Sequence, residues 1–371
     1  MKPMKTLLTT AILLAAAAAP LAAQDIIKFK DPSKNPDMEG EIATMSYKLV
    51  EIDINVGGSL ARQPADARLV ADLIPSNSKK SFDFAKGEES MANNDFDSAI
   101  ERFERTKKDA RASELQKQLS AINVVRCQYY KGNNPNGVIQ AAQALRSQKP
   151  DSFYIRESFE LEFKAQVFIR NATGAGAVAN AFAAMGNANG MQEWAKSGEL
   201  MQASLAELKQ DWRTALGIHK KYVRDHDVGE EATLGELRCL TGIPDWTALA
   251  SRADSIVKDA QDKKNFSTRL LIAAHNGKGD ALLNGGKPKD ALLEFLQGAM
   301  VLSKGETGPE HEASLGHSSV ACSKIAAAEK DKAKKDIYRG RAQEMLGELV
   351  QTYGKGSRFA TEAQKAMADI K

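Results

Sequence analysis

The sequence predicts a mainly α-helical protein, in which stacked helical hairpins follow a small β module. Alanine supplies 56 of the 371 residues and aromatic residues only 6%, a balance that favours close-packed helices over β-sandwiches. Six of the eleven prolines lie in residues 1–75, and the later ones fall at expected helix starts, where proline is tolerated. One spacing of glycine, alanine and phenylalanine also recurs in two distant segments.

The composition is that of an ordinary folded chain. Hydrophobic residues make up 43% and charged residues 27%, so intrinsic disorder is excluded. The formal net charge is only +3, which is too small for a strongly cationic nucleic-acid binder. We therefore expect no nucleic-acid partner.

Residues 1–23 have the layout of a secretory signal peptide. Lys2 and Lys5 precede an apolar run from Leu7 to Ala19, and small residues lead up to Ala23. This run is too short for a comfortable membrane span, so cleavage after Ala23 is expected, with a retained amphipathic anchor as the alternative. No later stretch suits a transmembrane segment. The mature chain is therefore expected to work in a periplasm or outside the cell.

Residues 24–76 are predicted to form the β module. Val50, Ile52 and Ile54 alternate with polar residues, as in a half-buried strand. Gly57-Gly58 predicts a turn, and further short strands are expected at 26–30, 41–45 and 67–73. Four or five strands in so short a segment indicate a strongly bent, SH3/Sm-like module. Such a module buries little core of its own and is expected to lean on the helical region, residues 77–371.

A repeat signature indicates the helical architecture. Gly87 is followed by Ala99 twelve residues later and by Phe103 four residues after that; Gly279, Ala291 and Phe295 repeat this spacing. The small residue lets two helices of a hairpin approach closely, alanine fills the contact without bulk, and phenylalanine anchors the pair.

These two segments resemble tetratricopeptide repeats, both in this skeleton and in the short turns Asn93-Asn94-Asp95 and Gly285-Gly286-Lys287. The resemblance implies an α-solenoid. The skeleton is lost between the two segments, but helical pairs can still be drawn there, at about 37 residues per unit. The expected pairs are 112–131 with 134–147, 152–170 with 175–186, 191–208 with 211–224, 231–241 with 244–260, and 310–329 with 332–352, before a terminal helix at 359–370. An irregular helical bundle or another α-solenoid is the alternative.

Residue patterns that carry chemistry are scarce. The nucleophile elbow GxSxG, the phosphate loop GxxxxGK[ST] and the HExxH motif are all absent. Cys127, Cys239 and Cys322 lack zinc-type spacing and are expected to be buried free thiols. His219-Lys220-Lys221-Tyr222 suits a phosphate contact, but no wider basic stripe supports it. We therefore expect no catalytic residue, no cofactor and no metal site.

Two hypotheses about function follow. The first is a non-catalytic exported scaffold that binds a protein or peptide in the cell envelope, as repeat arrays usually do. The family resemblance places groove contacts on the first helix of each pair. The candidate groove residues are Asn276, Asp280, Leu283 and Asn284, with Phe84, Glu88, Met91 and Ala92 at the matching positions of the first repeat. The second hypothesis is an envelope enzyme or carbohydrate-binding protein, although Trp194, Trp212 and Trp246 are too dispersed to predict an aromatic platform.

Overall fold

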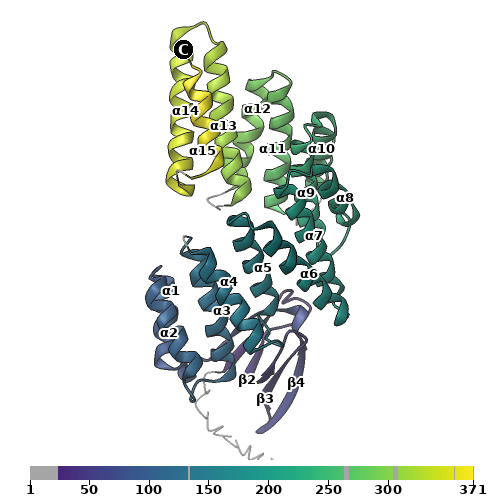
Figure 1. The fold of residues 1–371 in the computed structure, drawn as a ribbon, viewed down its shortest axis with the longest axis vertical. Coiled ribbons are helices and arrows are strands. Elements are labelled where there is room, and N and C mark those ends of the chain that lie inside the picture. The colour runs from purple at the N-terminus through teal and green to yellow at the C-terminus, as the bar shows by residue number, and fades with distance from the viewer. Residues whose placement is uncertain (1–23, 133, 263–266, 304–307, 355, 371) are drawn as a thin grey trace, which may run out of the picture. The chain divides into compact units, whose positions relative to one another are not determined.

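The structure is a computed structural model, and it describes residues 24–132, 134–262, 267–303, 308–354 and 356–370 (Figure 1). The predicted signal peptide, residues 1–23, lies outside the described residues. The chain divides into two compact units between Ala165 and Gln166, and each is described by itself.

The first unit begins with a five-stranded antiparallel sheet. Its strands are β1 (Asp25–Phe29), β2 (Met38–Met45), β3 (Leu49–Val56), β4 (Ser59–Asp66) and β5 (Val70–Ile74). The strand order is β4-β3-β2-β1-β5, and a 3₁₀ turn, η1 (Ala67–Leu69), precedes the last strand. The expected small β module is therefore confirmed as a five-stranded antiparallel sheet.

Glycines allow the sheet to bend and to turn. Strand β2 pairs with β1 through Met38–Gly40 and with β3 from Glu41 onward. A Cβ atom on Gly40 would lie 2.4 Å from the carbonyl oxygen of Asp53, so only glycine fits where β2 changes partner. Gly57 and Gly58 both have positive φ, +61° and +89°, as a type I′ hairpin requires. The predicted bend and turn are therefore both present.

Five helices follow the sheet. They are α1 (Phe82–Ala92), α2 (Phe96–Lys108), α3 (Glu114–Tyr130), α4 (Pro135–Gln148) and α5 (Ile155–Phe168). Ile27, Val50 and Leu73 of the sheet belong to the same buried cluster as Phe84 of α1 and Ile122 of α3. The β module therefore shares its core with the first helices, and this is why the boundary between the units falls within α5 instead of after the last strand.

The second unit is helical throughout its described residues. Its helices are α6 (Ala172–Ala188), α7 (Gln192–Leu208), α8 (Trp212–Tyr222), α9 (Gly229–Gly242), α10 (Trp246–Asp262), α11 (Thr268–Asn284), α12 (Pro288–Leu296) with the π-helical turn η3 (Gln297–Leu302), α13 (Pro309–Ala328), α14 (Lys332–Tyr353) and α15 (Arg358–Ala368). Helices lie at all the expected positions, including the terminal helix, and the expected pairs α3–α4, α7–α8, α9–α10 and α13–α14 are in contact. No helix among the described residues is long and apolar enough to cross a membrane.

Most of the hairpins turn in the same way. A residue with positive φ, such as Asn94, Gln210 or Gly286, follows the first helix. The next residue donates its backbone N–H to a carbonyl five positions earlier, for example Lys287 to Leu282 at 2.9 Å. This satisfies an orphan carbonyl of the first helix, as in a Schellman motif. The same residue is the N-cap of the second helix, as Asp95, Asp211 and Lys287 are, so consecutive helices run antiparallel with only a few residues between them.

The repeat skeleton has a direct physical explanation. A Cβ atom on Gly87 would lie 2.8 Å from the ring of Phe103, and one on Gly279 would lie 2.3 Å from the ring of Phe295. Each glycine therefore makes room for the phenylalanine ring of the partner helix. Both rings are fully buried, as are the alanines four residues before them, Ala99 and Ala291. The six structural positions thus form the predicted helix–helix contacts.

First and second helices differ in burial. Ten of the seventeen residues of α3, nine of the fourteen of α9 and eleven of the twenty of α13 are buried. In contrast, the second helices α4, α8 and α14 bury only two or three residues each. Helices α7, α9, α11 and α13 also contact one another in sequence. In the second unit, the first helices α7, α9, α11 and α13 therefore form an interior row, as neighbours in a solenoid do.

All three cysteines lie on interior first helices. Cys127, Cys239 and Cys322 are free and buried, which confirms the expectation of unpaired thiols. Burial raises the pKa of the Cys127 and Cys322 thiols to about 11 and that of Cys239 to about 12. In the folded chain without a bound metal ion, these thiols therefore stay protonated at neutral pH.

Candidate functional site

The groove residues predicted on α11 have partners inside the protein. Asn276 is buried; its amide donates to the Glu310 carbonyl at 2.8 Å, and its Oδ1 accepts from the Ser314 hydroxyl at 2.7 Å. Asp280 lies 3.0 Å from His317 Nδ1. Both residues therefore connect α11 to α13, the next first helix, and they are not free to contact a partner without breaking these bonds.

The Asp280–His317 pair is an interior ion pair. His317 is held between the rings of Phe295 and Phe359, with centroid distances of 5.1 and 5.2 Å. Burial disfavours its charged form, but the Asp280 carboxylate outweighs burial, and the net pKa of His317 is raised. Protonation of His317 therefore forms a largely buried ion pair with Asp280, and removal of either partner leaves the other group uncompensated.

The other two candidates on α11 differ from each other. Leu283 is half-buried and packs with Leu282 and Leu292 around Phe295. Asn284 is exposed, and its amide donates to the Asp280 carbonyl of its own helix at 2.9 Å. Asn284 is thus the member of this stripe whose side chain faces solvent.

The matching stripe on α1 has a similar division. Phe84 is fully buried and packs edge-on against Phe103 at 5.9 Å. Met91 is half-buried against the same core. Glu88 forms an ion pair with Lys80 at 2.7 Å, whereas Ala92 is exposed. The structure therefore assigns Phe84 and Met91 to packing and leaves Ala92 open to solvent.

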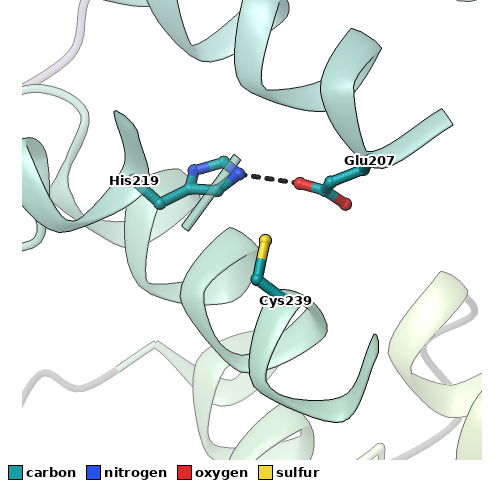
Figure 2. Close-up of side chains that lie close together, drawn as sticks. All are labelled: Glu207, His219 and Cys239. Atoms are coloured by element: carbon teal, nitrogen blue, oxygen red, sulfur yellow. Dashed lines mark hydrogen bonds and ion pairs between the residues drawn. The ribbon is translucent and has the colours of Figure 1, made fainter. Parts of the chain in front are cut away.

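A cluster that the sequence pattern did not predict lies between three helices of the second unit (Figure 2). Glu207 of α7, His219 of α8 and Cys239 of α9 bring one ligand-type atom each to within 4.8 Å of the others. His219 Nε2 lies 2.7 Å from Glu207 Oε1. His219 and Cys239 are almost completely buried, so His219 does not face a phosphate ligand at the surface.

Arg238 completes the surroundings of this cluster. Its guanidinium donates to both carboxylate oxygens of Glu207, at 2.8 and 3.1 Å. Burial alone would raise the pKa of Glu207, but the bonds from His219 and Arg238 lower it further than burial raises it. Glu207 is therefore an ionised carboxylate in the interior, held by two donors.

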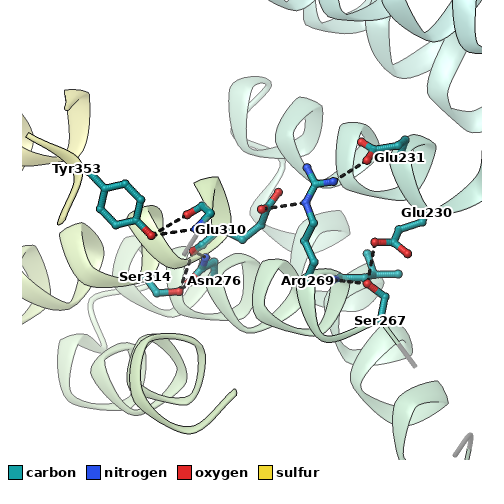
Figure 3. A network of polar contacts seen from close by, with 10 residues as sticks. Glu230, Glu231, Ser267, Arg269, Asn276, Glu310, Ser314 and Tyr353 are labelled. Atoms are coloured by element: carbon teal, nitrogen blue, oxygen red, sulfur yellow. Dashed lines mark hydrogen bonds and ion pairs between the residues drawn. The ribbon is translucent and has the colours of Figure 1, made fainter. Parts of the chain in front are cut away.

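A second polar network joins the N-terminal ends of three first helices (Figure 3). Arg269 of α11 contacts Glu231 of α9 at 2.5 Å and Glu310 of α13 at 3.0 Å. Ser267, the residue that caps α11, donates to Glu230 at 2.7 Å. Burial opposes the charge of Arg269, yet the two carboxylates leave its pKa raised. The network fixes neighbouring repeats in register.

The same network continues toward α14. Tyr353 Oη accepts from the Gly308 N–H at 3.0 Å and lies 2.8 Å from His311 Nδ1. His311 is buried, and its other ring nitrogen lies 3.2 Å from the Ala299 carbonyl. These groups satisfy one another, so the network is structural and leaves no polar group directed at a ligand.

The three tryptophans do not form an aromatic platform. Trp194 is buried, the Trp212 ring occupies the space beside Gly242, and Trp246 packs on the core that contains Leu249. Each therefore packs within its own part of the stack, as the helical apolar pattern predicted.

Comparisons with known proteins indicate the fold. The structure is similar to that of a tetratricopeptide repeat protein from Parabacteroides merdae, with a TM-score of 0.52 and 13% sequence identity. The match covers 77% of this chain and 97% of that protein. No protein-family model and no curated protein matches the sequence. At this identity the likeness supports the tetratricopeptide-like fold alone.

Proposed function

We propose that the protein is an exported, non-catalytic scaffold that binds a protein or peptide in the cell envelope. The observation that carries this proposal is the stack of helix pairs, whose fold is similar to a tetratricopeptide repeat protein. Stacked repeats present extended surfaces, and such arrays usually work by binding. The apolar, cleavable character of residues 1–23 supports export.

The interior polar networks support the same proposal. They hold consecutive first helices in fixed positions, as the contacts of Arg269 and Asn276 do. A rigid array loses little conformational entropy when a partner binds, which favours affinity. The charged groups that lie in the interior are paired with one another, and this arrangement suits a scaffold.

The test begins with the mature chain, residues 24–371, exported with a C-terminal affinity tag and cross-linked in living cells. A recovered partner is then purified and titrated into the chain by isothermal calorimetry. We expect a saturable isotherm of fixed stoichiometry, with the intact mass of the partner unchanged after incubation. Conversion of the partner to a product, or the absence of any saturable binding, would reject the proposal.

A further inference from the structure

We infer that Glu207, His219 and Cys239 form a binding site for a zinc-type divalent metal ion, which ties helices α7, α8 and α9 together. This site is separate from the groove predicted to bind a partner. The three residues come from two adjacent repeats, and their ligand-type atoms all lie within 4.8 Å of one another. The inference is independent of the proposed function, because the site is buried and needs no partner protein.

The donor set selects the class of metal. Thiolate sulfur, imidazole nitrogen and carboxylate oxygen together are the ligands of zinc sites in proteins. Calcium and magnesium prefer oxygen ligands alone, so Cys239 disfavours them. Three protein ligands leave a fourth tetrahedral position for a water molecule. The expected occupant is therefore Zn²⁺, with Co²⁺ as a spectroscopic substitute.

The geometry needs only small adjustments. Tetrahedral zinc with bonds of about 2.0–2.3 Å places its ligand atoms roughly 3.3–3.7 Å apart. The Glu207–His219 pair, now 2.7 Å apart, has to open by less than about 1 Å. The thiol of Cys239 has to approach by at most roughly 1.3 Å, from within the 4.8 Å limit. Side-chain rotations of this size leave the helices in place.

The imidazole is held in position by packing. A Cβ atom on Gly235 would lie 2.1 Å from the His219 ring, so only glycine on α9 leaves room for it. His219 Nδ1 is buried without a hydrogen-bond partner, and Nε2 is directed at the cluster (Figure 2). Metal-bound imidazoles are usually oriented by a bond from their other nitrogen. Here the close contact with Gly235 takes that role.

Arg238 orients the carboxylate. Its Nε donates to Glu207 Oε2 at 2.8 Å and its Nη2 donates to Oε1 at 3.1 Å, and Oε1 is the carboxylate oxygen nearest to His219. A bound Zn²⁺ is neutralised by the Glu207 carboxylate and the Cys239 thiolate, so Arg238 adds one uncompensated positive charge. Arg238 therefore lowers the affinity of the site for the metal ion, while it fixes which carboxylate oxygen of Glu207 binds the metal. The competing explanation is that His219 only donates a proton to Glu207, and the experiment separates the two.

The probe is Co²⁺ alone, added to the mature chain after chelation and reduction with a thiol-free reductant. Binding at this site gives about one equivalent per chain and the charge-transfer absorption of a cobalt–thiolate bond, and added Zn²⁺ removes both signals. Cys127→Ser and Cys322→Ser are matched controls, because they change buried thiols on other first helices. Both controls are expected to keep the band.

Cys239→Ser is expected to lose the thiolate band and to bind Co²⁺ at least about 100-fold more weakly, since outer-shell partners alone contribute 10–100-fold. A band that persists in Cys239→Ser, or no band at saturating Co²⁺ in the unsubstituted chain, overturns the inference. Circular dichroism checks that the variant folds. If it does not, X-ray absorption of Zn²⁺ bound to the unsubstituted chain decides: one sulfur neighbour supports the site, and none overturns it.

Discussion

Gly279→Ala tests whether the repeat glycine exists to accommodate a phenylalanine ring. A Cβ atom on Gly279 would lie 2.3, 2.6 and 2.7 Å from three ring carbons of Phe295. Real Cβ atoms do not approach carbon so closely, so the ring or the helix has to move. Phe295 is fully buried and also packs against His317, which leaves the ring little space to retreat.

The expected effect is a net destabilisation. Overpacking of a full core typically costs about 1–3 kcal/mol, whereas Gly→Ala in a helix interior gains about 0.5–1 kcal/mol. Gly279→Ala is therefore expected to lower the free energy of unfolding by roughly 1 kcal/mol, and by at most about 2.5 kcal/mol. Gly87→Ala should cost less, because its nearest ring carbon would be 2.8 Å away. Urea unfolding followed by circular dichroism measures both.

Gly347→Ala is the matched control. Gly347 lies inside α14, is exposed, and has open space where a Cβ atom would be. This change is expected to stabilise the chain by about 0.5–1 kcal/mol. In Gly279→Ala combined with Phe295→Leu, the smaller side chain should relieve most of the clash. Stabilisation by Gly279→Ala equal to that of Gly347→Ala would refute the explanation.

Four other outcomes are expected. Ala99→Leu and Ala291→Leu should each destabilise by about 1–3 kcal/mol through overpacking, because both alanines are fully buried; neutral results in urea unfolding would contradict the register. The raised pKa of His317 means that its pair with Asp280 stabilises fully below pH 6.5, its ordinary pKa, and is lost as pH rises through the folded pKa. In Asp280→Asn, the free energy of unfolding should fall less steeply over this pH range. An unchanged slope against pH would contradict a stabilising pair. The buried thiols should react with a thiol reagent only after unfolding, and labelling of the native chain would contradict their burial. Secreted or periplasmic protein should begin near Gln24 by intact mass, and a full-length mass would exclude cleavage.

Local patterns were sufficient to predict most of the fold. Helix periodicity and proline positions gave the helix pairs, even where the repeat skeleton is missing, because each hairpin has its own turn and caps. Strand β4 was missed. It is an edge strand that pairs with β3 alone, and its exposed residues, with Pro64 among them, lack the apolar alternation that marks a half-buried strand.

The candidate site was less predictable, because burial in a stack depends on neighbours that are distant in sequence. Asn276 and Asp280 share a helix face that looks exposed from one repeat alone, yet the next repeat covers it through Ser314 and His317. Glu207, His219 and Cys239 come from separate helices and match no short motif. In the sequence, these residues are linked only by their positions in the helices of two successive repeats. Those positions do not indicate that the three side chains meet.

The most direct test of the scaffold proposal asks which helices a partner touches. A photo-cross-linking residue is placed singly at Asn284 of α11 or Lys324 of α13, which are exposed on first helices, and at Lys258 of α10 or Gln343 of α14, which are exposed on second helices. Because the family resemblance places binding on first helices, partner adducts are expected from Asn284 and Lys324. Adducts from Lys258 and Gln343 alone, or from none of the four positions, would contradict binding in a groove of the repeat stack.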